Sequence, residues 1–135
     1  VSLSEHIDRT MARPIKIKHS VIMLNLRQHF QYGMDNDELY ETTRGVWRAV
    51  RHDNKYAFGV YKGVVQGVFE IDNWQPAGTA EYTLRSRDEV EFPNRWEFTG
   101  RKASNDIWNY YVGKSVKGYI NNPQWSHLYP YIDSE

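Results

Sequence analysis

Residues 35–74 read DNDELYETTRGVWRAVRHDNKYAFGVYKGVVQGVFEIDNW and contain the clearest periodicities in the chain. Asp35 with Glu38 three residues later is the capping-box arrangement that begins a helix. Apolar side chains then recur at helical spacing as far as Trp47. Gly45 interrupts this pattern, because a glycine inside a helix costs about 1 kcal/mol relative to alanine. The stretch therefore predicts a capped helix that ends at an Arg-Gly-Val-Trp corner.

Two strands joined by a tight turn follow this helix. Residues 56–61 alternate between two faces, and residues 64–71 continue as the partner strand. The Lys-Gly dipeptide between them suits a two-residue hairpin turn in which Gly63 takes a positive φ angle. Gly59 and Gly67 lie inside the strands, where glycine indicates a bend or the close approach of another segment. The apolar face expected for the second strand consists of Val65, Gly67, Phe69 and Ile71.

The rest of the chain predicts shorter and more widely spaced elements. Residues 21–26 form an apolar run, which indicates a buried first strand. The other expected elements are strands at 79–84, 95–100 and 128–132, a helix at 105–110 capped by Ser104, a helical turn at 113–120, and loops at 72–78 and 85–94. The strands lack a βαβ rhythm. We therefore expect an α+β fold, a small mixed or antiparallel β-barrel with two or three short helices.

The composition limits the classes of protein to which the chain can belong. Its 135 residues fit one domain, which we expect over residues 20–135 after a basic N-terminal extension at residues 1–19. No apolar run is long enough to cross a membrane, so we expect no membrane partner. The chain has no cysteine, which excludes disulfides and thiolate metal sites and fits a reducing, cytoplasmic setting. Its 17 basic and 17 acidic residues argue against binding to nucleic acid by bulk charge alone.

Catalytic and metal-binding motifs are weak in this sequence. The five histidines are isolated, and none has the spacing of a zinc motif. Residues 59–61 and 111–113 are similar to the two halves of a GIY-YIG nuclease signature, but they lie about fifty residues apart instead of on one hairpin. Glu97 has no lysine at the spacing of an acid-x-Lys nuclease. We therefore expect no catalytic residue, no metal ligand and no cofactor.

Aromatic and basic residues are interleaved along the chain, and aromatics make up 15% of it. Aromatic faces stack on bases, while guanidinium and ammonium groups hold phosphates. One tryptophan follows the expected helix end and another lies in the loop expected after the second strand, where ligands are commonly held. The expected base-binding residues are Trp47, Trp74, Tyr61, Asp72 and Asn73. The expected backbone-binding residues are Arg44, Arg48, Arg51 and Lys62. Core packing remains the alternative for each tryptophan, and simple turn chemistry for Asp72 and Asn73.

The same motifs resemble those of a known superfamily. The run RGVW at residues 44–47, a polar loop and then YAFGVYKGVVQGVFEID are similar to the middle of PUA-like domains, which include EVE, ASCH, YTH and SRA modules. The runs ETTRGVW and YVGKSV also resemble a set of uncharacterised bacterial proteins. The resemblance covers about residues 20–132 and implies a pseudo-barrel that accepts a flipped, modified base between aromatic residues. It also implies a module that occurs alone or fused to a restriction nuclease, with Arg44 and Trp47 beside the pocket and Trp74 near its rim.

The leading hypothesis from the sequence is a non-catalytic reader of a modified base in DNA or RNA, acting as the specificity domain of a restriction or defence system. Two alternatives remain open at this point. One is a small metal-dependent nuclease, and the other is a protein-interaction module of a larger assembly. An open cavity lined by both Trp47 and Trp74 would distinguish the first hypothesis from the other two.

Overall fold

A six-stranded mixed sheet forms the centre of the computed structural model, which describes residues 13–27, 29–48 and 50–130. The strands are β1 (Val21–Asn25), β2 (Gly45–Arg48), β3 (Tyr56–Tyr61), β4 (Val64–Pro76), β5 (Arg95–Lys102) and β6 (His127–Leu128). They lie in the order β2-β5-β4-β3-β1-β6, with β1 parallel to β3 and the other neighbours antiparallel. The helices of the described residues are α2 (Asn36–Arg44), α3 (Arg87–Val90), α4 (Asn105–Tyr111) and the 3₁₀ turn η1 (Lys117–Tyr119).

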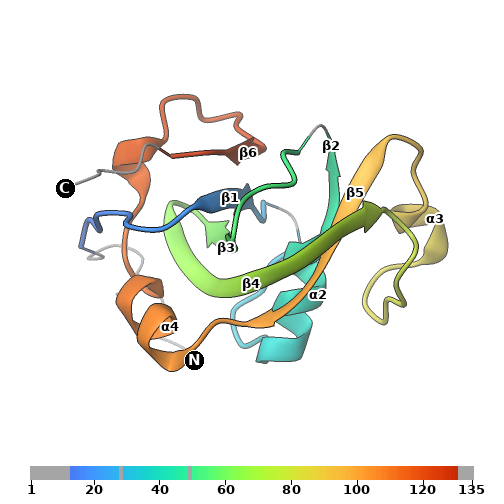
Figure 1. Ribbon diagram of the computed structural model, residues 1–135, viewed down its shortest axis with the longest axis horizontal. Coiled ribbons are helices and arrows are strands. Elements are labelled where there is room, and N and C mark those ends of the chain that lie inside the picture. Colours follow the sequence, from blue (N-terminus) through green and yellow to red (C-terminus); the bar gives the residue numbers. More distant parts are fainter. Residues whose placement is uncertain (1–12, 28, 49, 131–135) are drawn as a thin grey trace.

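The sheet curls into half of a barrel, and the long strand β4 bends across it (Figure 1). Its edge strands β2 and β6 are not hydrogen-bonded to each other within the described part of the chain. The predicted α+β class with a few short helices is therefore confirmed. The sheet is barrel-like in its curvature, but it stays open between its two edges.

Strand β1 is buried on both faces. Val21 and Met23 join an apolar cluster that includes Phe58 of β3 and Tyr111 of α4. The even-numbered side chains of β1 join a second cluster that includes Leu39 of α2 and Trp74 of β4. A strand covered on both faces reads as a continuous apolar run, which explains the sequence at residues 21–26. The prediction of a buried first strand is confirmed.

Helix α2 packs close to the sheet because two strand glycines leave room for it. Its N-terminus has the predicted capping box, in which Asp35 Oδ1 accepts from the Glu38 amide at 2.8 Å and Glu38 Oε1 accepts from the Asp35 amide at 3.0 Å. A Cβ atom at Gly59 would lie 2.7 Å from Oγ1 of Thr43, and one at Gly67 would lie 2.6 Å from a leucine methyl of α2. The close approach predicted for both glycines is confirmed.

The β3–β4 hairpin has the predicted two-residue turn. Lys62 and Gly63 take φ angles of 52° and 81°. Positive φ at both central residues is the pattern of a type I′ turn, whose twist matches that of the flanking strands. The positive φ predicted for the glycine is confirmed.

A bulge shifts the register of this hairpin. Gly59 faces Gly67, whereas the next residue of β3, Val60, faces Val65, so β4 has one extra residue. Because of the extra residue, odd-numbered side chains before and after the bulge point to opposite faces of the sheet. Val65 lies in the cluster of α4, while Phe69 lies in the cluster of α2. The prediction that Val65, Gly67, Phe69 and Ile71 share one apolar face is therefore wrong.

Strand β4 continues to Pro76, beyond its predicted end. Trp74 pairs with Phe98 of β5 and is only 6% exposed, inside the cluster of α2. The prediction of a loop at residues 72–78 is wrong for residues 72–76, because β5, which lies far along the sequence, supplies pairing partners for residues 73–76, whereas residues 77 and 78 do form a turn. Asp72 is the extra residue of a second bulge within the paired region.

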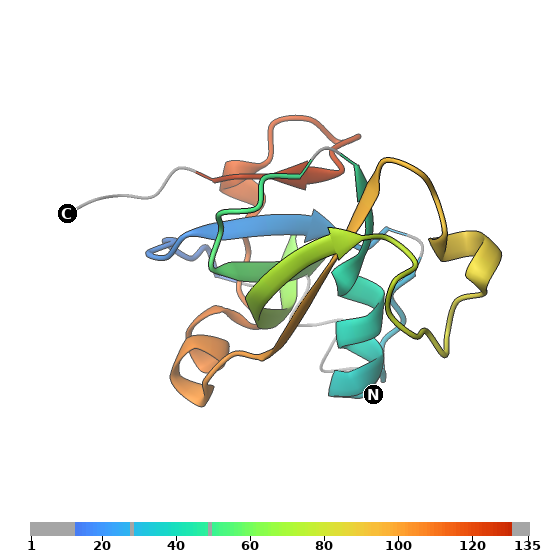
Figure 2. The ribbon, with the colours of Figure 1, turned by 45° about the vertical axis from the view of Figure 1, so that its right-hand side comes forward.

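Residues 77–86 form an irregular loop, so the strand predicted at residues 79–84 is wrong. Two backbone amides of this loop donate to the carboxylate of Glu97 on β5, and two others donate to Glu41 on α2. Because carboxylates satisfy these donors, the segment needs no strand partner. Helix α3 follows within the stretch predicted to be irregular, and loop and helix project beyond the ends of β4 and β5 (Figure 2).

The remaining elements agree in part with the sequence. Helix α4 follows Ser104 as predicted, and η1 lies within the helical turn expected at residues 113–120. Strand β6 begins one residue earlier than the strand predicted at residues 128–132 and ends at Leu128, so the prediction is wrong for residues 129 and 130, while residues 131 and 132 lie outside the described part. Of the expected extension at residues 1–19, residues 1–12 are also outside the described part, whereas Ile17 is fully buried in the cluster of α4.

Candidate functional site

Three cavities lie next to one another along the segment that follows β1. The large cavity has a volume of about 610 Å³, the central cavity about 260 Å³ and the outer cavity about 400 Å³. The large and central cavities share Asn25 and Arg27. The central and outer cavities share His29, Thr42 and Arg85. Because neighbouring cavities share lining residues, they form a row from the β3–β4 turn to the start of α2, which we call the groove.

The central cavity lies at the corner where α2 meets β2. Gly45, Val46 and Trp47 of this corner line it, and Leu26, directly after β1, adds another apolar wall. The indole Nε1 of Trp47 donates to the carbonyl oxygen of Thr43 at 2.8 Å. This bond fixes the orientation of the ring, because Nε1–H is the one hydrogen-bonding group of an indole. The corner therefore presents a half-buried aromatic surface in a fixed position.

Three basic side chains, Arg27, His29 and Arg85, also line the central cavity. Burial, followed by the charge of Arg85, lowers the pKa of His29 below its ordinary value of 6.5. The His29 ring is therefore neutral at pH 7, with one donor and one acceptor nitrogen. Among the described residues that line the large and central cavities there is no carboxylate. The lining of the outer cavity includes Glu38, whose carboxylate already caps α2.

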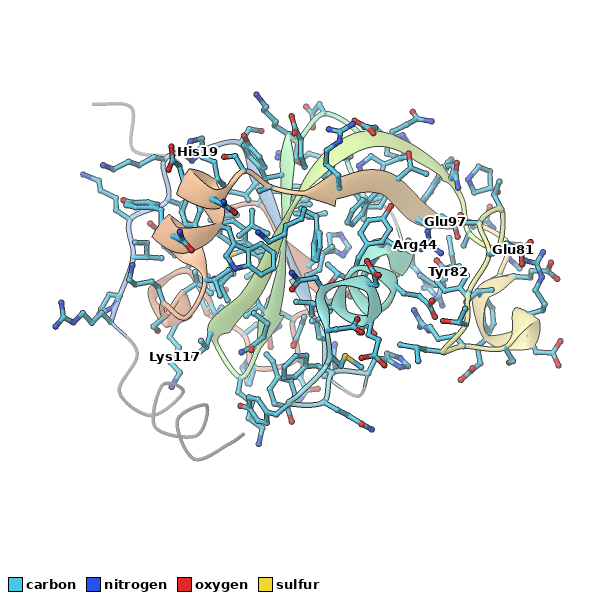
Figure 3. All side chains as sticks on the ribbon, turned by 90° about the horizontal axis from the view of Figure 1, so that it is seen from below. His19, Arg44, Glu81, Tyr82, Glu97 and Lys117 are labelled. Carbon is cyan, nitrogen blue, oxygen red and sulfur yellow. The ribbon has the colours of Figure 1, made fainter. Side chains whose placement is uncertain are left out.

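Arg85 reaches the cavity on the loop that two buried carboxylates anchor. Glu97 is fully buried and also accepts hydrogen bonds from the Tyr82 hydroxyl at 2.9 Å and the Gln75 amide at 2.6 Å. Figure 3 shows Tyr82 and Glu97 together beside this loop. Burial and then the Glu97 carboxylate raise the pKa of Tyr82, so its hydroxyl stays protonated as a donor. The Arg85 guanidinium donates to the carbonyl oxygen of Gly45, which ties the loop to the corner.

Glu41 makes the second anchor of the same loop. Both of its oxygens accept from the Thr83 amide at 2.9 Å, and Oε1 also accepts from the Thr83 hydroxyl at 2.9 Å. Burial opposes ionisation of Glu41, but the hydrogen bonds from Thr83 and Leu84 outweigh it and lower the pKa of Glu41. The carboxylate is therefore charged at neutral pH and holds the loop that carries Arg85.

Arg44, expected to contact a nucleic-acid backbone, lies in this anchor region instead of the groove. Its guanidinium lies over the ring of Tyr82 at 4.5 Å and over that of Tyr40 at 5.2 Å. It also donates to the carbonyl oxygen of Glu81, and Figure 3 shows Arg44 beside Tyr82. Arg44 lines none of the three cavities. Its contacts stabilise the loop that positions Arg85.

The large cavity brings together two residues that the sequence singled out. Tyr61 and Lys62 line it on the side of the β3–β4 turn. Lys117 and the 9% exposed Trp125 line it from the segment after α4. Tyr61 and Trp47 therefore lie at two neighbouring cavities, and Arg27 lies on the wall that these cavities share.

The other expected backbone contacts, Arg48 and Arg51, line none of the three cavities. Both side chains are exposed. The guanidinium of Arg51 lies 4.2 Å from the ring centre of Tyr129, and its backbone amide donates to the same tyrosine. Arg48 therefore follows Trp47 on β2 without lining the groove, and Arg51 contacts Tyr129 instead.

Trp74, Asp72 and Asn73 also lie away from the groove. The His52 ring stacks on Trp74 at 6.0 Å with an interplanar angle of 17°, and none of the three residues lines a cavity of the groove. Asp72 is paired at 2.7 Å with Arg101 across the bulge. The groove therefore contains Trp47 without Trp74, and the expected single cavity lined by both tryptophans is not found among these three cavities.

Sequence reasoning missed several residues of the groove. They are Arg27, His29, Arg85, Lys117 and Trp125. Arg27 had a usable signal, because it directly follows a buried strand, and loops at strand ends commonly hold ligands. Arg85 had none, because its position depends on two carboxylates that are 44 and 12 residues away in the sequence.

Two general features of the described residues bear on function. These residues contain no group of three or more histidines, aspartates and glutamates that could hold a metal ion. No helix among residues 13–27, 29–48 and 50–130 is long and apolar enough to span a membrane.

Comparisons with known proteins do not assign the chain to a family. Protein-family models give no match, and the same holds for curated proteins and for solved structures. The resemblance to PUA-like domains therefore stays a prediction, and the case for a function rests on the chemistry of the groove.

Proposed function

We propose that this protein is a non-catalytic nucleic-acid-binding module that holds one modified base of DNA or RNA in the central cavity. The observation that supports this function is that Trp47, Arg27, His29 and Arg85 line a single cavity of about 260 Å³. Cavities for drug-sized ligands usually exceed about 300 Å³, so the central cavity suits one planar ring system. Aromatic surface together with guanidinium groups is the combination that binds a base and its phosphates.

Each wall of the central cavity has a role in this proposal. The fixed indole of Trp47 stacks on the base. Leu26 and Val46 supply apolar contact for a methyl substituent. Nε2 of the neutral His29 ring accepts from the Arg85 guanidinium at 3.4 Å, so His29 offers its Nδ1–H donor to the base edge. Arg85, held by its loop, supplies a positive charge for a phosphate.

Binding of labelled DNA and RNA oligonucleotides, with and without methylated bases, tests this proposal at one stated salt concentration. We expect one modified oligonucleotide to bind more tightly than its unmodified counterpart. Trp47→Ala should weaken that binding by about 1–3 kcal/mol, the usual contribution of one base–aromatic stack. Phe92→Ala is the matched control, because Phe92 is 47% exposed and lies outside the groove.

The proposal is wrong if no oligonucleotide binds, or if folded Trp47→Ala protein binds as tightly as the original chain. The same preparations test the alternatives from the sequence. Cleavage of the oligonucleotides in the presence of magnesium or manganese would indicate a nuclease. Retention of a partner protein without any binding of oligonucleotides would indicate an interaction module.

A further inference from the structure

The wall between the central and large cavities is built from side chains with fixed positions. Nη2 of Arg27 donates to the carbonyl oxygens of Trp125 at 2.9 Å and of Gln124 at 3.2 Å. Nδ2 of Asn25 donates to the same Trp125 oxygen at 3.0 Å. These bonds use only one nitrogen of the guanidinium, which has five N–H donors in total. Arg27 therefore stays available to an anion at the boundary of the two cavities.

The large cavity has walls that suit a second base. Tyr61 and Trp125 give it aromatic surface, and Asn121 and Asn122 give it amide groups that can pair with a base edge. The exposed cation Lys117 lies at the same cavity. At about 610 Å³ it is larger than the central cavity, which leaves space for the sugar as well as the ring.

The position of Lys117 is set by the turn between β3 and β4. A Cβ atom at Gly63 would lie 2.5 Å from Cγ of Lys117, so the aliphatic part of the lysine packs directly on the glycine. Lys62, which precedes this glycine, lines the same cavity and is exposed. Two lysines thus meet at the edge of the large cavity although they are distant in the sequence. The protein as a whole has no net charge, so this local concentration of cations is a feature of the groove.

We propose that the target is a single strand, with one base in the central cavity, the next base in the large cavity and the phosphate between them at Arg27. This inference rests on the proposed function and names its substrate class. In a duplex a reader takes one base out of the stack, and its neighbours remain stacked. Two adjoining base-sized cavities require two successive bases to leave the stack, which only an unpaired strand allows without further loss of pairing.

Binding of one labelled oligonucleotide as a single strand and as a duplex with its complement tests the target class. We expect the single strand to bind at least tenfold more tightly than the duplex, because its bases are already free to unstack. A dinucleotide should also bind more tightly than the mononucleotide that occupies the central cavity. Equal or tighter binding of the duplex would overturn the proposal of a single-stranded target.

Asn121→Trp tests the large cavity without disturbing the core, because Asn121 is exposed at the lining of that cavity. The added ring fills space, so the advantage of the dinucleotide over the mononucleotide should disappear while mononucleotide binding is unchanged. If the dinucleotide keeps its full advantage in this folded variant, the large cavity is not a base subsite.

A charge-matched pair of double variants tests the phosphate contacts. Lys62→Ala with Lys117→Ala removes two cations of the groove, whereas Lys18→Ala with Lys55→Ala removes two exposed cations that line none of its cavities. Figure 3 shows His19, the neighbour of Lys18, well separated from Lys117. The first variant should weaken single-strand binding and reduce the slope of log K against log salt by about 0.7 for each lost contact. Equal effects of both variants would contradict the proposed path of the strand.

The two proposals fail in different ways. If no oligonucleotide binds in any form, the proposed function is wrong and the single-strand inference is wrong with it. If oligonucleotides bind through Trp47 but the duplex is preferred and Asn121→Trp has no effect, only the single-strand inference is wrong.

Discussion

Two tryptophans that look alike in the sequence, Trp47 and Trp74, lie in very different surroundings. Both were expected to bind the base. Trp47 lies on the edge strand β2, is half-buried and lines the central cavity. Trp74 lies on β4, which has a neighbouring strand on each side, and is 6% exposed. The position of a strand in the sheet therefore decided which tryptophan faces a cavity.

A single buried carboxylate connects these two regions. Glu97 of β5 lies opposite Gly45 of the corner on one side and opposite Gln75, next to Trp74, on the other. It is also the anchor of the loop that carries Arg85 to the central cavity. Substitutions on the two sides of Glu97 should consequently have different effects. Those near Trp74 should mainly lower the free energy of unfolding, and those near Trp47 should mainly lower the affinity for the ligand.

The largest effect on stability is expected for Trp74→Ala. Removal of a buried tryptophan typically costs about 3–5 kcal/mol, because contacts are lost and a cavity remains. Trp47→Ala should cost clearly less, since its ring is only half-buried. Trp74→Phe is the control: it keeps most of the apolar contact and removes an indole N–H that has no partner among the described residues. Chemical denaturation of the three variants measures the difference, and equal losses for Trp47→Ala and Trp74→Ala would contradict it.

A somewhat smaller loss is expected for Glu97→Gln. Four donors point at the two oxygens of Glu97, two at each. A glutamine would place its own NH₂ group against two of these donors, at a cost of about 2–3 kcal/mol for the unsatisfied groups. Because the loop then loosens, oligonucleotide affinity should fall together with the free energy of unfolding.

Glu70→Gln is the matched control for this change, because the half-exposed Glu70 pairs with the exposed Arg101. Denaturation curves and binding isotherms of the two variants should separate clearly. Equal stability of both variants would show that the four hydrogen bonds of Glu97 do not hold the loop.

The pH dependence of stability should reflect Glu41, the other anchor. Its folded-state pKa is lowered from 4.5, so its contribution is fully present above pH 4.5 and is lost as the pH falls through the folded pKa. Glu41→Gln should be less stable than the original chain at pH 7, by about 1–2 kcal/mol for the lost charge-assisted bonds. The difference should shrink as the pH is lowered below 4.5. A difference that stays constant between pH 7 and acid pH would contradict this role.

The smallest effect is expected for Asp72→Asn. Asp72 and Arg101 form an exposed pair, and such pairs contribute little to stability because water and salt screen their charges. Since Asp72 also lies away from the groove, both stability and oligonucleotide affinity should change little. A large loss of affinity in this variant would place the base near β4 instead of at Trp47, and would reverse the comparison between the two tryptophans.

Local patterns were sufficient for much of the scaffold. The capping box at Asp35, the turn at Gly63 and the buried run at residues 21–26 all depend on neighbours within a few residues, and the structure has each of them. The wrong predictions concern places where segments distant in the sequence meet. Bulges and the partner strand β5 changed the faces and the length of β4, and no short window of sequence contains that information.

The sequence by itself determined the α+β class, the helix that ends at the Arg-Gly-Val-Trp corner, and Trp47 and Tyr61 as aromatic candidates. Only the tertiary structure decided which charged residues join them. Arg27 and Arg85 are 58 residues apart, and a buried carboxylate on a third segment brings the second one to the cavity. Periodicity and capping are local interactions that a sequence displays directly, whereas the groove is formed by contacts between segments that only folding brings together.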